Sequence, residues 1–221
     1  MLNNIKGKLI VSCQALENEP LHSSFIMGRM ALAAKEGGAS GIRAQGIEDI
    51  NEIKKNVDLP VIGIIKRSYD DSEIYITPTL KEVEDLLNTE CEMIALDATM
   101  RKRPNDEKLE DLVKAIHEGG KLAMADISTL EEGIQAEKLG FDCISTTLSG
   151  YTPYSTQSPT VDIPLLKALV EKVSVPVICE GKINTPEDLK EAFNKGAYSA
   201  VVGGAITRPQ QITKRFTDIL K

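Results

Sequence analysis

Eight short apolar runs alternate with eight stretches of helical spacing along nearly the whole chain. The apolar runs occupy residues 8–13, 40–45, 60–66, 92–99, 121–127, 142–150, 176–181 and 199–205. The helical stretches follow at residues 23–38, 47–56, 80–90, 106–120, 129–140, 163–173, 186–196 and 209–220. Strands that alternate with helices favour a parallel sheet with helices packed on its outer face. This alternation constrains the fold more than any other feature of the sequence.

The number of units selects among the parallel folds. Eight units in 221 residues give about 28 residues each, the size expected for a (β/α)8 TIM barrel of the phosphate-binding type. The sequence therefore predicts a single barrel domain over residues 1–221. An open doubly wound sheet is the alternative, but no glycine-rich dinucleotide turn follows the first apolar run. Gly119, Gly140 and Gly196 are predicted to end helices in the left-handed conformation.

Composition and charge exclude several classes of function. The net charge of −7 argues against nucleic acid as a partner, because such proteins carry basic surfaces. No apolar run approaches the ~18 residues of a membrane span, so no membrane contact is predicted. The four cysteines show no CxxC spacing, which predicts reduced thiols in a cytoplasmic protein. No cluster of histidine, cysteine and carboxylate has the spacing of a metal site, so no metal is predicted.

Charged residues end several of the apolar runs. Residues two apart on a strand face the same way, so Lys66 is in phase with Ile62 and Ile64, and Glu180 with Ile178. Barrels carry their chemistry at the C-terminal ends of the strands. An isolated charge there is ordinarily part of a salt bridge or a cap, but a ring of opposite charges favours a site. The candidates are Gln14, Arg43, Lys66, Asp97, Asp126, Glu180 and Arg208, of which Asp97 also fits an Asx turn.

Glycines follow the last two apolar runs. Gly181 and Lys182 come after the seventh run, and Gly203 and Gly204 after the eighth. Bare backbone lets N–H groups approach an anion closely, and barrels often bind phosphate at these two loops. The sequence therefore predicts a phosphate site formed by these four residues. Residues 147–162 form the longest loop after a strand and are predicted to be a flexible flap over the site.

The motifs taken together resemble the N-acetylmannosamine-6-phosphate 2-epimerase family. The similarity is carried by SCQA, IRAQG, PVIGIIKR, IALDATMRKRP, ADIST, TTLSGYT, PVICEGKINTPED and VVGGAITRP, in this order. It implies a (β/α)8 barrel of bacterial sialic acid catabolism. The enzyme would interconvert N-acetylmannosamine 6-phosphate and N-acetylglucosamine 6-phosphate without a cofactor. It also implies a homodimer.

The resemblance assigns roles to individual residues. It implies that Lys66 is the catalytic base and that Glu180 is its carboxylate partner. It places substrate contacts at Gln14, Arg43, Asp126 and Arg208, and the phosphate at Gly181, Gly203 and Gly204. Inversion at C2 requires loss of a proton next to a carbonyl, so the sugar ring must open first.

The residues leave some alternatives open. A base at Lys66 must be neutral, which Arg43 or burial would favour and Glu180 would oppose. A lysine at a strand end equally suits a lyase that forms a Schiff base. A non-catalytic sugar-phosphate sensor is the third reading. The roles of Arg101 and Arg103 stay open, and His22 and His117 are interpreted as structural.

Overall fold

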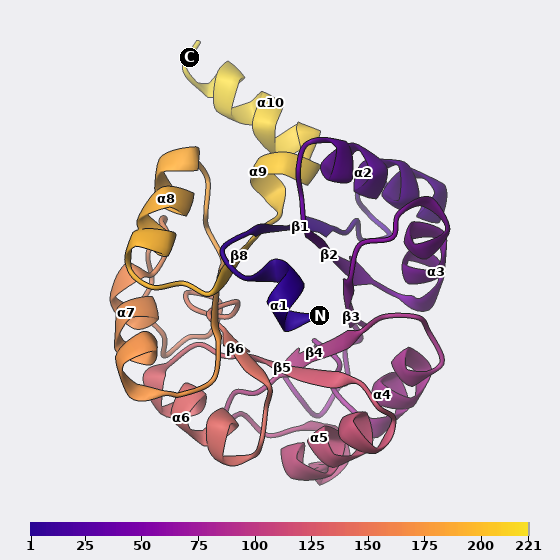
Figure 1. Cartoon of the computed structure of the whole chain (residues 1–221), viewed down its shortest axis with the longest axis vertical. Helices are drawn as coiled ribbons and strands as arrows, with labels where there is room; N and C mark the ends of the chain where they lie inside the picture. Colours follow the sequence, from indigo (N-terminus) through magenta and orange to yellow (C-terminus); the bar gives the residue numbers. More distant parts are fainter. Residues whose placement is uncertain (221) are drawn as a thin grey trace.

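Each of the eight apolar runs forms one strand, as predicted, in the computed structural model, which describes residues 1–220. The strands pair in parallel and in chain order, and β8 closes on β1 to complete a barrel (Figure 1). The (β/α)8 fold is therefore confirmed. The strands are β1 (Leu9–Cys13), β2 (Gly41–Gln45), β3 (Val61–Ile64), β4 (Met93–Asp97), β5 (Leu122–Asp126), β6 (Cys143–Ser145), β7 (Val177–Glu180) and β8 (Ser199–Val202).

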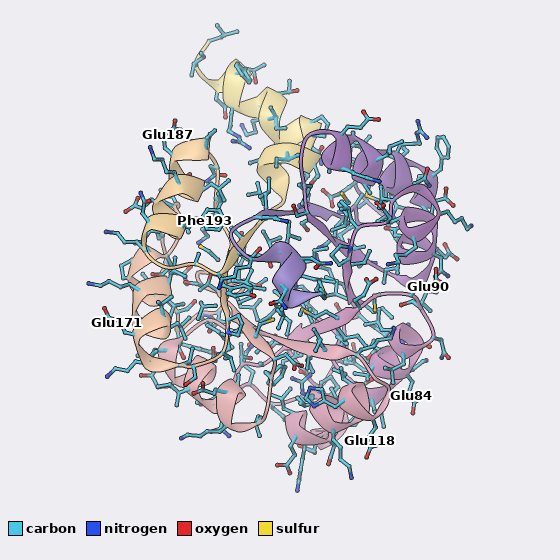
Figure 2. The ribbon with its side chains drawn as sticks, viewed as in Figure 1. Glu84, Glu90, Glu118, Glu171, Glu187 and Phe193 are labelled. Carbon is cyan, nitrogen blue, oxygen red and sulfur yellow. The ribbon has the colours of Figure 1, made fainter. Side chains whose placement is uncertain are left out.

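The eight predicted helices also form. They are α2 (Ser24–Glu36), α3 (Ile47–Asn56), α4 (Leu80–Leu87), α5 (Leu109–Glu118), α6 (Leu130–Lys138), α7 (Ile163–Lys172), α8 (Pro186–Asn194) and α10 (Pro209–Asp218). Three short helices were not predicted: α1 (Leu2–Ile5), α9 (Gly204–Thr207) and the 3-10 turn η1 (Pro104–Asp106). Glu84, Glu118 and Glu171 project outward from the ring of helices (Figure 2), as expected for amphipathic helices on a barrel.

The core has two layers. Ile10, Ile62, Ile64 and Ile178 lie in a cluster that fills the barrel interior. Ile5 of α1 belongs to this cluster, and α1 lies over the centre of the barrel in Figure 1. This short helix therefore closes the end of the barrel at which β1 begins. The larger cluster lies between the outer face of the strands and the helices.

Two of the three glycines predicted to end helices in the left-handed conformation do so, and the prediction for Gly119 is wrong. Gly140 and Gly196 have φ values of +87° and +97°, so they adopt the left-handed conformation that was predicted. Gly119 has φ −78° and is the C-cap of α5, while Gly120 has φ +74°. The chain therefore turns at the second glycine of the Gly119–Gly120 pair, one residue later than predicted.

The last helix leaves the ring. α10 points away from the barrel (Figure 1), and none of its residues is buried. Leu9 and Val11 of β1 therefore line an apolar groove on the outside of the barrel, together with Ile26 and Met30 of α2. Within residues 1–220, no helix has both the length and the apolar character that a membrane span requires.

Candidate active site

A cavity of about 470 Å³ lies at the C-terminal ends of the strands, within the size range of small-molecule sites. Eight of the ten predicted site residues line it, and they come from the C-terminal ends of β1, β3, β7 and β8 and the segments that follow them. These are Gln14, Lys66, Glu180, Gly181, Lys182, Gly203, Gly204 and Arg208. The other two, Arg43 and Asp126, are not on its wall.

Arg43 and Asp126 lie buried next to Glu180, a residue of the cavity wall. Arg43 is 1% exposed and Asp126 is fully buried. The Arg43 guanidinium donates through Nη1 to Asp126 Oδ1 at 3.0 Å, through Nη2 to Asp126 Oδ2 at 2.5 Å, and through Nη1 to Glu180 Oε2 at 2.7 Å. Burial by itself would lower the pKa of Arg43, but the two carboxylates raise it above its usual value. Arg43 is therefore a fixed cation that holds Glu180 in place.

Glu180 ends β7 with its two oxygens in different settings. Oε2 accepts from Arg43 and from Thr147 Oγ1, the latter at 3.2 Å. Oε1 has no hydrogen-bond partner among residues 1–220, and Glu180 lines the cavity. Burial raises the pKa of Glu180 to about 7, with Asp126 adding to the rise, while Arg43, Thr147 and Lys66 oppose it. Glu180 can therefore exchange a proton near neutral pH.

Lys66 lies two residues beyond the end of β3, where its backbone pairs with Ile76. Its Nζ makes no hydrogen bond or ion pair with any residue of the described chain. Burial, together with the charges of Arg43 and Arg208, lowers the pKa of Lys66 to about 8, against the opposing effect of Glu180 and Glu19. The effects that lower the pKa of Lys66 therefore outweigh the effects of Glu180 and Glu19 that raise it.

The glycines after β7 and β8 leave backbone groups bare. Gly181 has φ +98° and Lys182 has φ +58°, so this turn is left-handed. The N–H groups of Gly181, Lys182, Gly203 and Gly204 make no backbone hydrogen bond within residues 1–220. A Cβ at Gly204 would lie 2.3 Å from Gln211 Oε1, so a side chain would not fit there without movement. Such a turn can hold an anion by its N–H groups.

The charged residues around this turn are themselves held in place. Lys182 Nζ donates to the Ser158 carbonyl at 2.5 Å and lies 5.1 Å from the centre of the Tyr151 ring. Arg208 donates to Glu19 through Nε at 2.6 Å and Nη2 at 3.0 Å. Both side chains line the cavity, so two cations flank the glycine turns.

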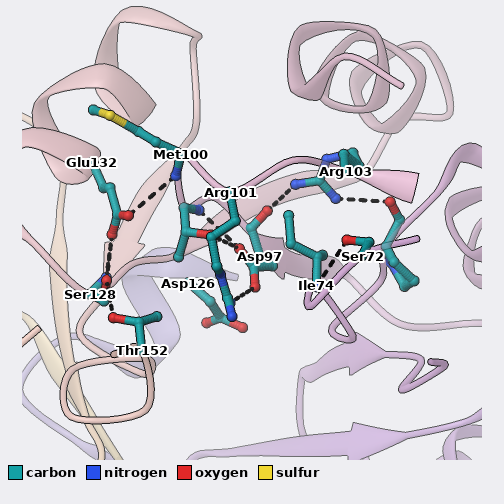
Figure 3. A network of polar contacts seen from close by, with 12 residues as sticks. Ser72, Ile74, Asp97, Met100, Arg101, Arg103, Asp126, Ser128, Glu132 and Thr152 are labelled. Carbon is teal, nitrogen blue, oxygen red and sulfur yellow. Dashed lines mark hydrogen bonds and ion pairs between the residues drawn. The ribbon is translucent and has the colours of Figure 1, made fainter. Parts of the chain in front are cut away.

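The long loop between β6 and α7 covers part of the cavity, because its Tyr151 and Pro159 line the wall. Tyr154, in the same loop, donates to Glu132 Oε1 at 2.7 Å. Glu132 also accepts from Met100, Ser128 and the backbone of Thr129. Figure 3 shows this carboxylate joining the loop after β4 to Ser128, which Thr152 contacts in turn. The flap position is as expected, and its flexibility stays a prediction.

Asp97 and its neighbours form a structural network outside the cavity. Asp97 Oδ1 accepts from the Thr99 backbone at 2.9 Å, which is the Asx turn that the sequence allowed, and Oδ2 pairs with Arg101 at 2.6 Å (Figure 3). Arg103 donates to the carbonyls of Pro78 and Asp97. Arg101 and Arg103 therefore brace the loop after β4 and do not line the cavity.

Both histidines lie outside the main cavity. His117 Nε2 lies 2.9 Å from Asp142 Oδ2, and His22 Nδ1 lies 3.1 Å from the Ala15 carbonyl. Across residues 1–220, no three His, Cys, Asp or Glu residues gather as a metal site would require.

Sequence reasoning missed several polar side chains near the cavity, among them Ser12, Tyr75 and Gln45. Ser12 lies on β1 two residues before Gln14 and accepts a hydrogen bond from its amide at 2.8 Å. Tyr75 belongs to the loop after β3 and lines the wall. Gln45 ends β2 two residues after Arg43. The period of two along a strand would have found Ser12 and Gln45, whereas Tyr75 lies in an irregular loop and carries no such signal.

Comparison with known proteins identifies the family. The family model described as "Putative N-acetylmannosamine-6-phosphate epimerase" matches residues 27–221. The chain belongs to the N-acetylmannosamine-6-phosphate epimerase family. Proteins named "Putative N-acetylmannosamine-6-phosphate 2-epimerase" are 77% identical in Clostridium perfringens strain SM101, over the full length of both chains, and 64% identical in Clostridioides difficile, over 100% of this chain and 99% of that one. An epimerase interconverts two isomers, so the family belongs to the isomerases.

Solved structures agree with this assignment. The structure of the N-acetylmannosamine-6-phosphate 2-epimerase from Clostridium perfringens superposes with a TM-score of 0.98 at 76% identity, covering 99% of this chain and 96% of that one. A thiamine phosphate pyrophosphorylase from Pyrococcus furiosus matches with a TM-score of 0.63 at 21% identity, over 99% of this chain and 96% of that one. The second likeness concerns the barrel fold alone.

Proposed function

We propose that this protein epimerises N-acetylmannosamine 6-phosphate to N-acetylglucosamine 6-phosphate at C2, by removal and return of one proton and without a cofactor. The observation that carries the proposal is the pair of proton-exchanging groups on one cavity. The pKa of Lys66 is lowered to about 8 and that of Glu180 is raised to about 7. General acid–base catalysis is most efficient when the catalytic pKa values lie near the working pH.

The chemistry begins with the open-chain aldehyde, because only a carbonyl at C1 makes the C2 proton acidic. Neutral Lys66 takes this proton, and an enediolate-like anion forms across C1 and C2. A proton that has exchanged with solvent is then delivered to the other face of C2. Lys66 acts as the principal base, and Glu180, through its free Oε1, belongs to the return path or its proton supply. Because the two groups exchange protons in one cavity, they titrate as a pair.

The remaining residues bind and orient the substrate. The bare N–H groups after β7 and β8, with Lys182 and Arg208 beside them, suit the 6-phosphate. Gln14 lines the cavity and suits the sugar hydroxyls. Arg43 and Asp126 were predicted to touch substrate, but their burial favours an indirect role in which they fix Glu180.

The test is incubation with N-acetylmannosamine 6-phosphate in deuterated water, followed by proton NMR. We expect N-acetylglucosamine 6-phosphate to form with deuterium at C2. If Lys66 and Glu180 each act on one face of C2, the substrate recovered early in the reaction carries no deuterium. If one base serves both faces, deuterium appears at C2 of substrate and product from the start. Absence of any epimer would contradict the proposed function. Unphosphorylated N-acetylmannosamine should turn over far more slowly, and equal rates would remove the phosphate assignment.

A Schiff-base lyase is the rival reaction, and it predicts a different product. Borohydride added during turnover would reduce a Schiff base and leave the substrate carbon skeleton attached to Lys66. We expect no such adduct by mass spectrometry of the intact protein. An adduct at Lys66 would favour the lyase over the epimerase.

We place this reaction in the cytoplasmic breakdown of sialic acid and amino sugars. Support comes from the phosphorylated substrate and from the four cysteines, which are all free and buried. The barrel is also proposed to work as a homodimer, because the apolar groove along β1 and the exposed helix α10 are both left uncovered by the chain itself.

A further inference from the structure

A second hollow of about 390 Å³ adjoins the catalytic lysine. It is lined by Leu16, Glu17, Asn18, His22, Gln45 and Lys66. Lys66 also lines the main cavity, so the lysine stands between the two. The phosphate end of the main cavity is formed after β7 and β8, whereas this hollow is formed by the loop after β1 and by the ends of β2 and β3.

Gln45 is placed in this hollow by the register of the barrel. Arg43 pairs with Ser12 on one side and with Ile62 on the other, and its side chain points into the barrel to reach Asp126. Gln45 follows two residues later and therefore faces the same way, one layer nearer the mouth. The pairing of Gln45 with Ile64 puts it beside the end of β3, two residues before Lys66.

The Gln45 amide has no partner. Its Oε1 is buried and accepts no hydrogen bond, and its Nε2 donates none within residues 1–220. A buried polar group that lacks a partner loses its hydrogen bonds to water without replacement, and native proteins leave few such groups. An unsatisfied amide at the mouth of a binding cavity fits a ligand that supplies the missing hydrogen bonds. A carboxamide both donates and accepts, so its best complement is a second amide.

The proposed substrate carries one amide, and it is attached to the reacting carbon. C2 bears both the proton that Lys66 removes and the acetamido nitrogen. When Lys66 reaches the C2 proton, the acetamido group must lie within a few ångströms of the lysine. The hollow beside Lys66 provides space for it, and Leu16, with 40% of its surface exposed, offers an apolar contact for the methyl group.

We propose that Gln45 binds the acetamido group of the substrate and makes the site selective for 2-N-acyl sugar phosphates. The inference rests on the proposed function, because it uses Lys66 as the base at C2. Gln45 accepts from the acetamido N–H and donates to its carbonyl. The phosphate site and the proton-transfer residues are then common to many sugar phosphates, and the amide contact supplies the selectivity.

The test compares two ligands that differ at C2 alone. N-acetylglucosamine 6-phosphate carries the acetamido group, and glucose 6-phosphate carries a hydroxyl. Dissociation constants are measured by calorimetry for the wild type, for Gln45→Met, which keeps the length and removes the hydrogen bonds, and for Gln135→Met on the exposed side of α6 as the control. We expect Gln45→Met to weaken binding of the acetamido sugar by about 10- to 100-fold and to change glucose 6-phosphate binding less than twofold.

Each outcome decides between recognition and a structural role. Equal losses for both ligands would make Gln45 a structural residue, and no loss for either would remove it from the site. The wild-type protein gives a further check that needs no variant. It should bind the acetamido sugar at least tenfold more tightly than glucose 6-phosphate, and equal affinities would overturn the proposal. Because binding is measured without turnover, failure of the epimerase assignment would appear separately, as absence of an epimer in the NMR experiment.

Discussion

At the scale of single residues, the proposed role of Lys66 as a base carries a cost to stability. A base must give up its own proton to act, and burial of the Lys66 amine near Arg43 and Arg208 lowers its pKa toward the neutral range. The same surroundings disfavour the charged lysine in the folded protein. Active sites commonly trade stability for function in this way.

Lys66→Met should therefore abolish activity and stabilise the fold. We expect turnover to fall by at least about 100-fold, since general bases contribute 10²–10⁴. The pKa of Lys66 is about 8 in the folded protein and 10.5 in the reference state, so the penalty is fully present below pH 8 and disappears as the pH rises toward 10.5. In chemical denaturation at pH 7, the free energy of unfolding of Lys66→Met should exceed that of the wild type by on the order of 1–3 kcal/mol. This difference should vanish near pH 10.5.

Lys190→Met is the matched control, because Lys190 is exposed on α8. It should change neither activity nor stability. A Lys66→Met protein that retains near wild-type turnover would remove Lys66 as the base. Loss of stability at pH 7 would contradict the electrostatic argument.

The two proton-exchanging groups predict a bell-shaped pH profile. The active state holds one proton between Lys66 and Glu180, so it is depleted below about pH 7 and above about pH 8. We expect kcat/KM to peak between these values. Glu180→Gln should lose most activity and leave a single limb that rises with pH, because only Lys66 then titrates. A bell that persists in Glu180→Gln would assign the acidic limb to another group.

The sequence pattern predicted which residues lie at the strand ends, because strand geometry alone decides their positions. The period of two placed Lys66 and Glu180 at the mouth, because each continues the face of an interior isoleucine. It did not reveal that the two Nη groups of Arg43 bind Asp126 and Glu180 below the cavity wall, since that depends on side-chain packing across the barrel. The sign of the Lys66 pKa shift likewise depends on burial, which no local pattern contains.

At the scale of elements, the eight strand–helix units were readable because each helix repeats its apolar positions over several turns. The four-residue helices α1 and α9 are too short for a periodicity to show. The prediction that Gly119 is the left-handed residue after α5 was wrong because the local sequence does not distinguish Gly119 from Gly120. Gly119 and Gly120 are adjacent and chemically identical, and tertiary packing decides which of them turns the chain.

Glu132 shows how one helix terminus organises the loops at the mouth. As the third residue of α6 it forms a capping box with Thr129, and it is 1% exposed. Its two oxygens accept hydrogen bonds from the loop after β4, the turn before α6 and Tyr154 of the flap. A single carboxylate therefore couples the end of a helix to the flap that borders the cavity.

Glu132→Ala should destabilise the protein strongly, because it leaves several buried donors unsatisfied. We expect a loss of about 2–4 kcal/mol in chemical denaturation and a raised KM from a looser flap. Glu131→Ala, next to it and exposed, is the control and should cost less than about 0.5 kcal/mol. Equal effects of the two substitutions would show that Glu132 does not organise these loops.

At the scale of the whole molecule, the strands close into a barrel, but apolar residues stay exposed on its outer surface. α10 carries Ile212 and Phe216 one turn apart, and Ile219 and Leu220 follow its end; Phe216, Ile219 and Leu220 are 69%, 80% and 82% exposed. The apolar groove of about 570 Å³ along β1 and α2 is empty of the chain's own side chains. Exposed apolar surfaces of this kind mark contacts with other chains. A groove and an apolar helix on the same molecule can satisfy each other in a symmetric pair.

The chain is therefore expected to be a dimer in which α10 of each copy packs on the groove of the other. Phe216→Glu places a charge in the centre of the apolar face, so it should shift the protein toward monomer in sedimentation velocity at micromolar concentration. Thr217→Glu adds the same charge on the flank of that face and should leave the dimer intact.

Arg208, which lines the cavity, also immediately precedes α10. Loss of the dimer should for this reason raise KM for the phosphorylated sugar as well. A wild-type protein that is monomeric throughout this range, or a Phe216→Glu protein that stays dimeric, would mean that these surfaces do not meet.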